Sequence, residues 1–97
     1  MEAARVADLR GHRVTLLERQ GRLGGSMLLA STVHAENEAF FQWLTQQVKD
    51  SSVDLRLGTE ASAELLFDLK PDAIVVATGA RVATPDIPGS DQPNVFS

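Results

Sequence analysis

A carboxylate directly follows an apolar segment near the start of the 97-residue sequence. Glu18 comes after Arg13–Leu17, which reads RVTLL and predicts a short buried β-strand. In dinucleotide-binding folds, an acidic residue at the end of the second strand hydrogen-bonds a ribose, because two oxygens can accept from neighbouring hydroxyls. Glu18 is therefore a candidate ribose ligand. The alternative is a solvated carboxylate at a strand end, which Glu18 taken alone favours.

Two glycine-containing segments are the other candidates for ligand contact. Residues 22–26 read RLGGS, and consecutive glycines permit positive φ angles and close approach of a ligand. Residues 75–80 read VVATGA, so a buried strand would end in small residues at the edge where open α/β sheets bind ligands. An ordinary surface turn explains the first segment equally well, and a tight turn after a core strand explains the second. The order and spacing of all three segments favour a binding site.

Six elements are expected to position these residues. We predict helices over Glu2–Arg10, Glu36–Asp50 and Ser62–Leu69, and strands over Arg13–Leu17, Val53–Leu57 and Ala73–Ala77. Met27–Val33 is apolar but has no clear period, so its structure stays open. The alternation of helix and strand predicts one α/β domain with parallel strands over residues 1–97.

The longest expected helix has an apolar stripe that predicts its core face. The stripe consists of Phe40, Phe41, Leu44 and Val48, with Trp43 beside it. This helical spacing already explains the aromatic residues as core, so no ligand-stacking role is needed for them. After Arg81 the chain contains three of its four prolines and is expected to be an extended loop.

Composition excludes several classes of function. The net charge of −4 argues against nucleic acid or an anionic membrane as the main partner. The sequence has no cysteine, which excludes disulfides and metal–thiolate sites. His34 has no second His, Asp or Glu at metal-ligand spacing, and His12 is expected to be a solvated turn residue. No apolar run approaches the ~20 residues of a membrane span, and no signal peptide is evident. A cytoplasmic location is the expectation.

Four segments resemble one enzyme family. They are EAARVADLRGHRVTLLER, RLGG, VDLRLGTE and DAIVVATGARVATPDIPG, together with the gap lengths between them. The chain is similar over essentially its whole length to flavin-dependent oxidoreductases that join an old-yellow-enzyme-type barrel to a C-terminal dinucleotide-binding part. This family includes 2,4-dienoyl-CoA reductase, trimethylamine dehydrogenase and histamine dehydrogenase. The resemblance implies a segment of their FAD- or ADP-binding domain.

The resemblance also implies roles for particular residues. Glu18 would bind the adenosine ribose, and Arg19 would lie by the adenine or its ribose. The loop near the dinucleotide would be formed by Arg22, Leu23, Gly24 and Gly25. The strand that returns under the cofactor would be marked by Ala77, Thr78 and Gly79. No catalytic residue is implied here, and FMN and an iron–sulfur cluster would belong to other parts of the parent enzyme. Ser26 departs from the Gln or His that often follows the two glycines in the family.

The family's G-x-G-x-x-G turn and the strand before it have no counterpart in this sequence. We therefore expect a Rossmann-like parallel sheet with flanking helices, missing its first strand and glycine-rich loop. That strand would lie between 13–17 and 73–77, so its absence leaves an open sheet edge that invites a homodimer. FAD or ADP would bind weakly without the phosphate-binding turn, and the isolated chain would not be catalytic. The alternatives are an α/β interaction module without nucleotide and an NAD(P)-binding domain.

Overall fold

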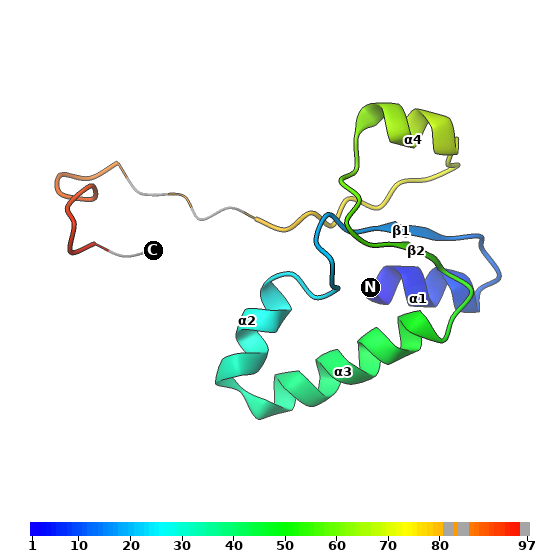
Figure 1. Ribbon diagram of the computed structural model, residues 1–97, viewed down its shortest axis with the longest axis horizontal. Coiled ribbons are helices and arrows are strands. Elements are labelled where there is room, and N and C mark those ends of the chain that lie inside the picture. Colours follow the sequence, from blue (N-terminus) through cyan, green and yellow to red (C-terminus); the bar gives the residue numbers. More distant parts are fainter. Residues whose placement is uncertain (81–82, 84–85, 96–97) are drawn as a thin grey trace.

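The computed structural model describes residues 1–80, 83 and 86–95, and it contains four helices and two strands (Figure 1). The elements are α1 (Glu2–Leu9), β1 (Thr15–Leu17), α2 (Ser26–Val33), α3 (Ala35–Lys49), β2 (Asp54–Arg56) and α4 (Ala63–Leu69). All three predicted helices are confirmed, with their ends shifted by one residue or fewer. The apolar segment that the sequence left open forms α2.

β1 and β2 pair to form a two-stranded parallel sheet. Leu16 of β1 is aligned with Leu55 of β2, and the strands run in the same direction. The Asp54 N–H donates to the Val14 carbonyl at 2.9 Å, and the Glu18 N–H donates to the Arg56 carbonyl at 3.0 Å. The prediction of an α/β fold with parallel strands is therefore confirmed for these two strands. Their carboxyl ends meet at one edge, as parallel pairing requires.

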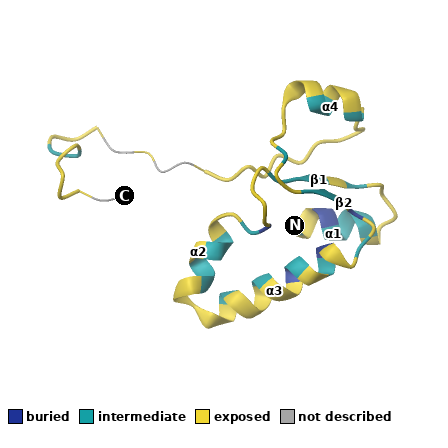
Figure 2. Cartoon of the chain, in the orientation of Figure 1, coloured by how far each residue is buried: buried dark blue, intermediate teal, exposed yellow. Residues whose placement is uncertain are grey.

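The core is small and lies between the sheet, α1 and α3. Its buried residues are Ala4, Leu23, Val48 and Val53. Partly buried Met1, Val14, Leu16 and Leu55 pack against them. Figure 2 shows that the buried positions are confined to this region, while α4 and the described residues 86–95 are largely exposed. The free energy of folding therefore depends on few side chains.

The apolar stripe of α3 is only partly buried. Leu44 and Val48 are in the interior, as predicted, but Phe40 is exposed along with neighbouring Trp43. The prediction of a core role for Phe40 is wrong because α1 and α2 do not cover its side of the helix. Phe40 and Trp43 instead stack on each other, with ring centroids 5.9 Å apart.

The segment Ala73–Ala77 is not a strand, and the prediction of a third strand is wrong. Its backbone forms no ladder with β1 or β2, which make a two-stranded sheet in the described part of the chain. Ile74, Val75 and Val76 are 55%, 73% and 78% exposed. A β-branched apolar sequence favours extended backbone, but a strand also needs a hydrogen-bonded neighbour, and the described residues provide none here.

An ion pair in α1 contacts the exposed aromatic pair of α3. The Arg5 guanidinium donates to both carboxylate oxygens of Glu2, at 2.6 and 2.9 Å, and lies 5.3 Å from the centre of the Trp43 ring. The hydrogen bond from Arg5 lowers the pKa of the Glu2 carboxyl below its ordinary value of 4.5 and raises the pKa of Arg5. Since both side chains are at the surface, the pair makes a small, salt-sensitive contribution.

This arrangement predicts an acid-dependent change in the fluorescence of Trp43, the only tryptophan in the chain. A lowered carboxyl pKa means that the pair stabilises α1 above pH 4.5 and loses this effect as the pH falls through the lower pKa of the folded protein. We expect Trp43 emission to be constant from pH 7 to about 5 and to change below that range. Glu2→Gln should abolish the acid transition, and Glu36→Gln should retain it. An unchanged transition in Glu2→Gln would contradict the assignment.

Among the described residues, no helix is both long and apolar enough to cross a membrane.

Candidate dinucleotide-binding residues

Glu18 lies at the carboxyl end of β1 and is held by the turn that follows it. Its Oε1 accepts a hydrogen bond from the Gln20 N–H at 2.8 Å. The same turn is joined to the segment after β2, because the Thr59 N–H donates to the Glu18 carbonyl at 2.8 Å and the Gly58 N–H donates to the Gln20 carbonyl at 2.9 Å. The Glu18 side chain is thus fixed by local hydrogen bonds, while Oε2 has no such bond among the described residues and is able to accept one from a ligand.

Gln20, Gly58 and Thr59 are neighbours of Glu18 that the sequence reasoning missed. The available signal was the Gly-Thr pair immediately after the second predicted strand. In a parallel sheet, the residues that follow neighbouring strands meet at the same edge, so this pair was placed to contact the turn after Glu18. Arg19 lies in that turn and is exposed.

The two glycines of the RLGG loop differ in what surrounds them. Gly24 has φ +123°, and a Cβ on it would lie 2.6 Å from Phe41 Cε2 and 2.8 Å from Leu28 Cγ. Gly25 precedes α2 with φ +51°, and a Cβ on it would meet nothing within 4 Å. Gly24 is therefore required for packing of the loop on α3, whereas Gly25 has open space where a ligand could approach.

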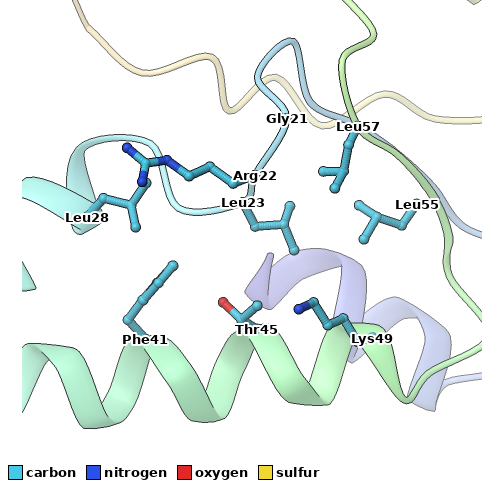
Figure 3. Close-up of a pocket in the computed structure, with 9 residues that line it drawn as sticks. All are labelled: Gly21, Arg22, Leu23, Leu28, Phe41, Thr45, Lys49, Leu55 and Leu57. Carbon is cyan, nitrogen blue, oxygen red and sulfur yellow. The ribbon is translucent and has the colours of Figure 1, made fainter.

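Leu23 is part of the core and is not available for ligand contact. Its side chain is buried in the core cluster, so the structure gives Leu23 a packing role. A cavity of about 240 Å³ lies beside it. The lining residues are Gly21, Arg22, Leu23, Leu28, Phe41, Thr45, Lys49, Leu55 and Leu57 (Figure 3).

The lining of this cavity is poorly suited to phosphates. Figure 3 shows leucine side chains from the loop and from the β2 region facing α3, with Phe41, Thr45 and Lys49 rising from the helix. The Arg22 side chain extends toward Leu28 instead of into the space near Leu55. Since the walls are mainly apolar, we assign the cavity to loose packing between the loop and α3, separate from the polar turn at Glu18.

The third group of candidate residues, at the end of the segment 73–79, is not hydrogen-bonded to the other two groups within the described residues. Ala77, Thr78 and Gly79 are exposed, and Gly79 has φ +82° with open space around its Cα. Among the described residues, no hydrogen bond joins them to Glu18 or to the RLGG loop. The structure therefore places Glu18 and Arg19 in one turn and packs Leu23 and Gly24 on α3. No group of three or more His, Asp or Glu within the described ranges is placed to hold a metal ion.

Curated relatives match nearly the whole chain. Bilirubin reductase from Mediterraneibacter gnavus is 44% identical over 99% of the chain, and NADH oxidase from Thermoanaerobacter brockii is 38% identical over 99%. Cinnamate reductase from Clostridium sporogenes is 37% identical over 95%. These relatives are flavin-dependent oxidoreductases of the 2,4-dienoyl-CoA reductase-like type, and the chain is similar to one segment of them. The family resemblance inferred from the four sequence segments is confirmed.

The match to this oxidoreductase family covers only part of each relative. The chain spans 15% of the length of the bilirubin reductase and of the NADH oxidase, and 14% of the cinnamate reductase. No family model and no solved structure matches the chain. The similarity therefore concerns this segment, and the activity of a whole enzyme is a separate question.

Proposed function

We propose that the chain is a segment of the FAD- or ADP-binding domain of a flavin-dependent oxidoreductase, where it positions a dinucleotide for electron transfer. The observation that supports this most is the placement of Glu18 at the carboxyl end of a parallel strand, with one carboxylate oxygen held by the Gln20 N–H. A carboxylate fixed at this edge is suited to accept a hydrogen bond from a ribose hydroxyl. The relatives' names as reductases and an oxidase agree with a redox parent.

In this proposal, the chain supplies binding groups and no acid, base or nucleophile. Glu18 Oε2 accepts from the ribose, Arg19 lies by the adenine or its ribose, and Gly25 leaves room for the ligand backbone to approach. Ala77, Thr78 and Gly79 would come under the cofactor only when their segment is paired in a larger sheet. The flavin supplies redox chemistry when bound, and FMN and an iron–sulfur cluster would belong to the rest of the parent enzyme.

The proposal places the phosphate-binding groups outside these residues. In a Rossmann-like fold, a glycine-rich turn and the following helix N-terminus donate backbone N–H groups to the pyrophosphate. Here the first turn of α1 contains the Glu2 carboxylate, whose negative charge opposes a phosphate at that position. A preceding strand and turn in the parent would complete the sheet between β1 and residues 73–77. We expect the 97-residue chain alone to bind ADP and FAD weakly.

A titration of isotopically labelled chain with ADP and FAD, followed by amide NMR spectra, tests the proposal. We expect shifts confined to the turn at Glu18–Gln20, with a dissociation constant on the order of 1 mM or weaker, because charged phosphate bonds worth about 1.5–3 kcal/mol each are lacking. Glu18→Gln should weaken ADP binding roughly tenfold, since it removes one charge-assisted bond. Glu60→Gln, an exposed carboxylate beyond β2, should have no effect.

Two results would contradict the proposal. Stoichiometric, submicromolar binding of FAD would show that the phosphate-binding turn is dispensable. Equal shifts in the wild type and in Glu18→Gln would show that the carboxylate does not contact the nucleotide, and the ribose role of Glu18 would then be lost.

A further inference from the structure

An apolar segment of the chain is extended and has no packing partner. Ile74, Val75 and Val76 lie in non-helical backbone between α4 and the C-terminal segment, and each has more than half of its surface exposed. No backbone hydrogen bond involves residues 71–79 among the described residues. Three consecutive exposed β-branched apolar residues, with unpaired N–H and C=O groups, have the composition of a strand that lacks its sheet.

The same chain contains a strand edge that is open. β1 pairs with β2 on one side only, so the backbone groups that β1 directs to its other side have no ladder partner in the described part of the chain. Residues 14–17 contain no charged side chain and no proline. Natural proteins protect exposed edges with lysines, prolines or covering elements. The β1 edge has none of the side-chain protections.

The total exposed surface is larger than a compact chain of this size presents. The chain exposes 8020 Å². A folded monomer of 10.5 kDa exposes roughly 5,400 Å² by the usual scaling with mass. The difference exceeds the ~800 Å² per partner that a standard stable interface buries. The chain therefore has enough unburied surface for a dimer without unfolding any element.

We propose that the 97-residue chain forms a two-fold dimer in which residues 73–77 of each copy add to the β1 edge of the other. Each copy offers one extended apolar segment and one open edge, so a two-fold arrangement satisfies both in both copies and closes. Pairing through two β1 edges alone would leave Ile74, Val75 and Val76 in water. For the 97-residue chain, a second copy added in this way pairs the backbone of both segments and also buries the exposed apolar residues of 73–77.

Sedimentation equilibrium of the full chain measures the association directly. We expect dimers at concentrations of tens of micromolar, and Val75→Lys should raise the dimer dissociation constant at least tenfold, because it places a charge in the added strand. Val33→Lys is the matched control: Val33 of α2 is 72% exposed and Val75 is 73% exposed, but Val33 lies outside the proposed interface. A wild-type monomer at 100 μM, or equal dissociation constants in the two variants, would overturn the proposal.

Engineered thiols identify which segments meet. The chain has no cysteine, so Thr15→Cys in β1 and Val75→Cys carry unique thiols. Under mild oxidation, a mixture of the two single variants should give a disulfide heterodimer as the main product. A main product of Thr15→Cys homodimers would indicate β1-to-β1 pairing, and a disulfide within the doubly substituted monomer, with none in the mixture, would indicate pairing inside one chain. Either of these two results would overturn the swapped arrangement.

The dimer test is independent of nucleotide binding. Both Val75 and Thr15 lie outside the turn at Glu18–Gln20, so association can be measured with no ligand present. A chain that dimerises but shifts no Glu18–Gln20 amide with ADP would support this inference and contradict the proposed function. A chain that stays monomeric but whose Glu18–Gln20 amides shift with ADP would contradict this inference and support the proposed function.

Discussion

Val48→Ala is expected to lower the free energy of unfolding by about 2 kcal/mol or more. Val48 is 1% exposed and is the only fully buried large side chain among the described residues. It connects α3 to Ala4 of α1 and Val53 before β2. Removing two methyl groups from a core with so few members leaves a cavity that neighbouring side chains cannot fill. The corresponding fall in melting temperature is about 8–16 °C for a chain of this length.

Thermal and urea denaturation, followed by far-ultraviolet circular dichroism, measure this effect. Val33→Ala provides the matched control, because it removes the same two methyl groups from an exposed helical valine. We expect the control to change stability by less than 0.5 kcal/mol in magnitude, roughly the usual range for surface substitutions. Equal losses in both variants would contradict the assignment of Val48 to the core.

Local patterns were sufficient to predict most of the elements. The runs RVTLL and VDLRL contain the observed strands β1 and β2, and the stretch that begins at Ser62 contains α4. The Ser62 Oγ accepts from the Leu65 N–H at 3.1 Å, and the helix ends at Leu69, where the C-cap residue Lys70 has φ +47° before Pro71. Caps, glycines and prolines act over a few residues, so a single sequence reveals them.

Features that depend on distant neighbours were not predictable in the same way. Residues 73–77 have the composition of a strand, but the hydrogen-bonded neighbour that makes a strand is not among the described residues. Phe40 has the spacing of a core residue, but no element covers its side of α3. Sequence patterns report which residues are able to be buried. Whether they are buried depends on what else packs against them.

The same distinction applies to the candidate site. The position of Glu18 after a strand follows from local pattern, and the structure places it at the carboxyl end of β1. The packing roles of Leu23 and Gly24 depend on α3, which begins ten or more residues later, so the loop as a sequence gave no reason to separate them from Gly25. A glycine pair predicts a special backbone conformation without saying whether a ligand or the protein itself requires it.

Gly24→Ala is expected to destabilise the chain by about 2–4 kcal/mol and to detach the RLGG loop from α3. The substitution combines a strained backbone at φ +123° with overlap, because the new Cβ would lie 2.6 Å from Phe41 Cε2 and 2.8 Å from Leu28 Cγ. The Phe41 ring could swing away, but it would then expose the apolar cavity and the buried Leu23 next to it. Amide hydrogen exchange should show faster exchange in α2, which follows this loop and packs on α3.

Gly21→Ala tests whether the loss of stability in Gly24→Ala comes from the contact with Phe41 or from replacing any glycine of this loop by alanine. Gly21 lies three residues earlier, has no positive φ, and would place its Cβ in open space. We expect the Gly21→Ala variant to be as stable as the wild type or slightly more stable, because alanine restricts the unfolded chain more than glycine does. If both variants lose stability equally, the contact with Phe41 is not the cause. If only Gly24→Ala loosens α2, the first glycine of the pair serves the fold, and Gly25 is the one left for a ligand.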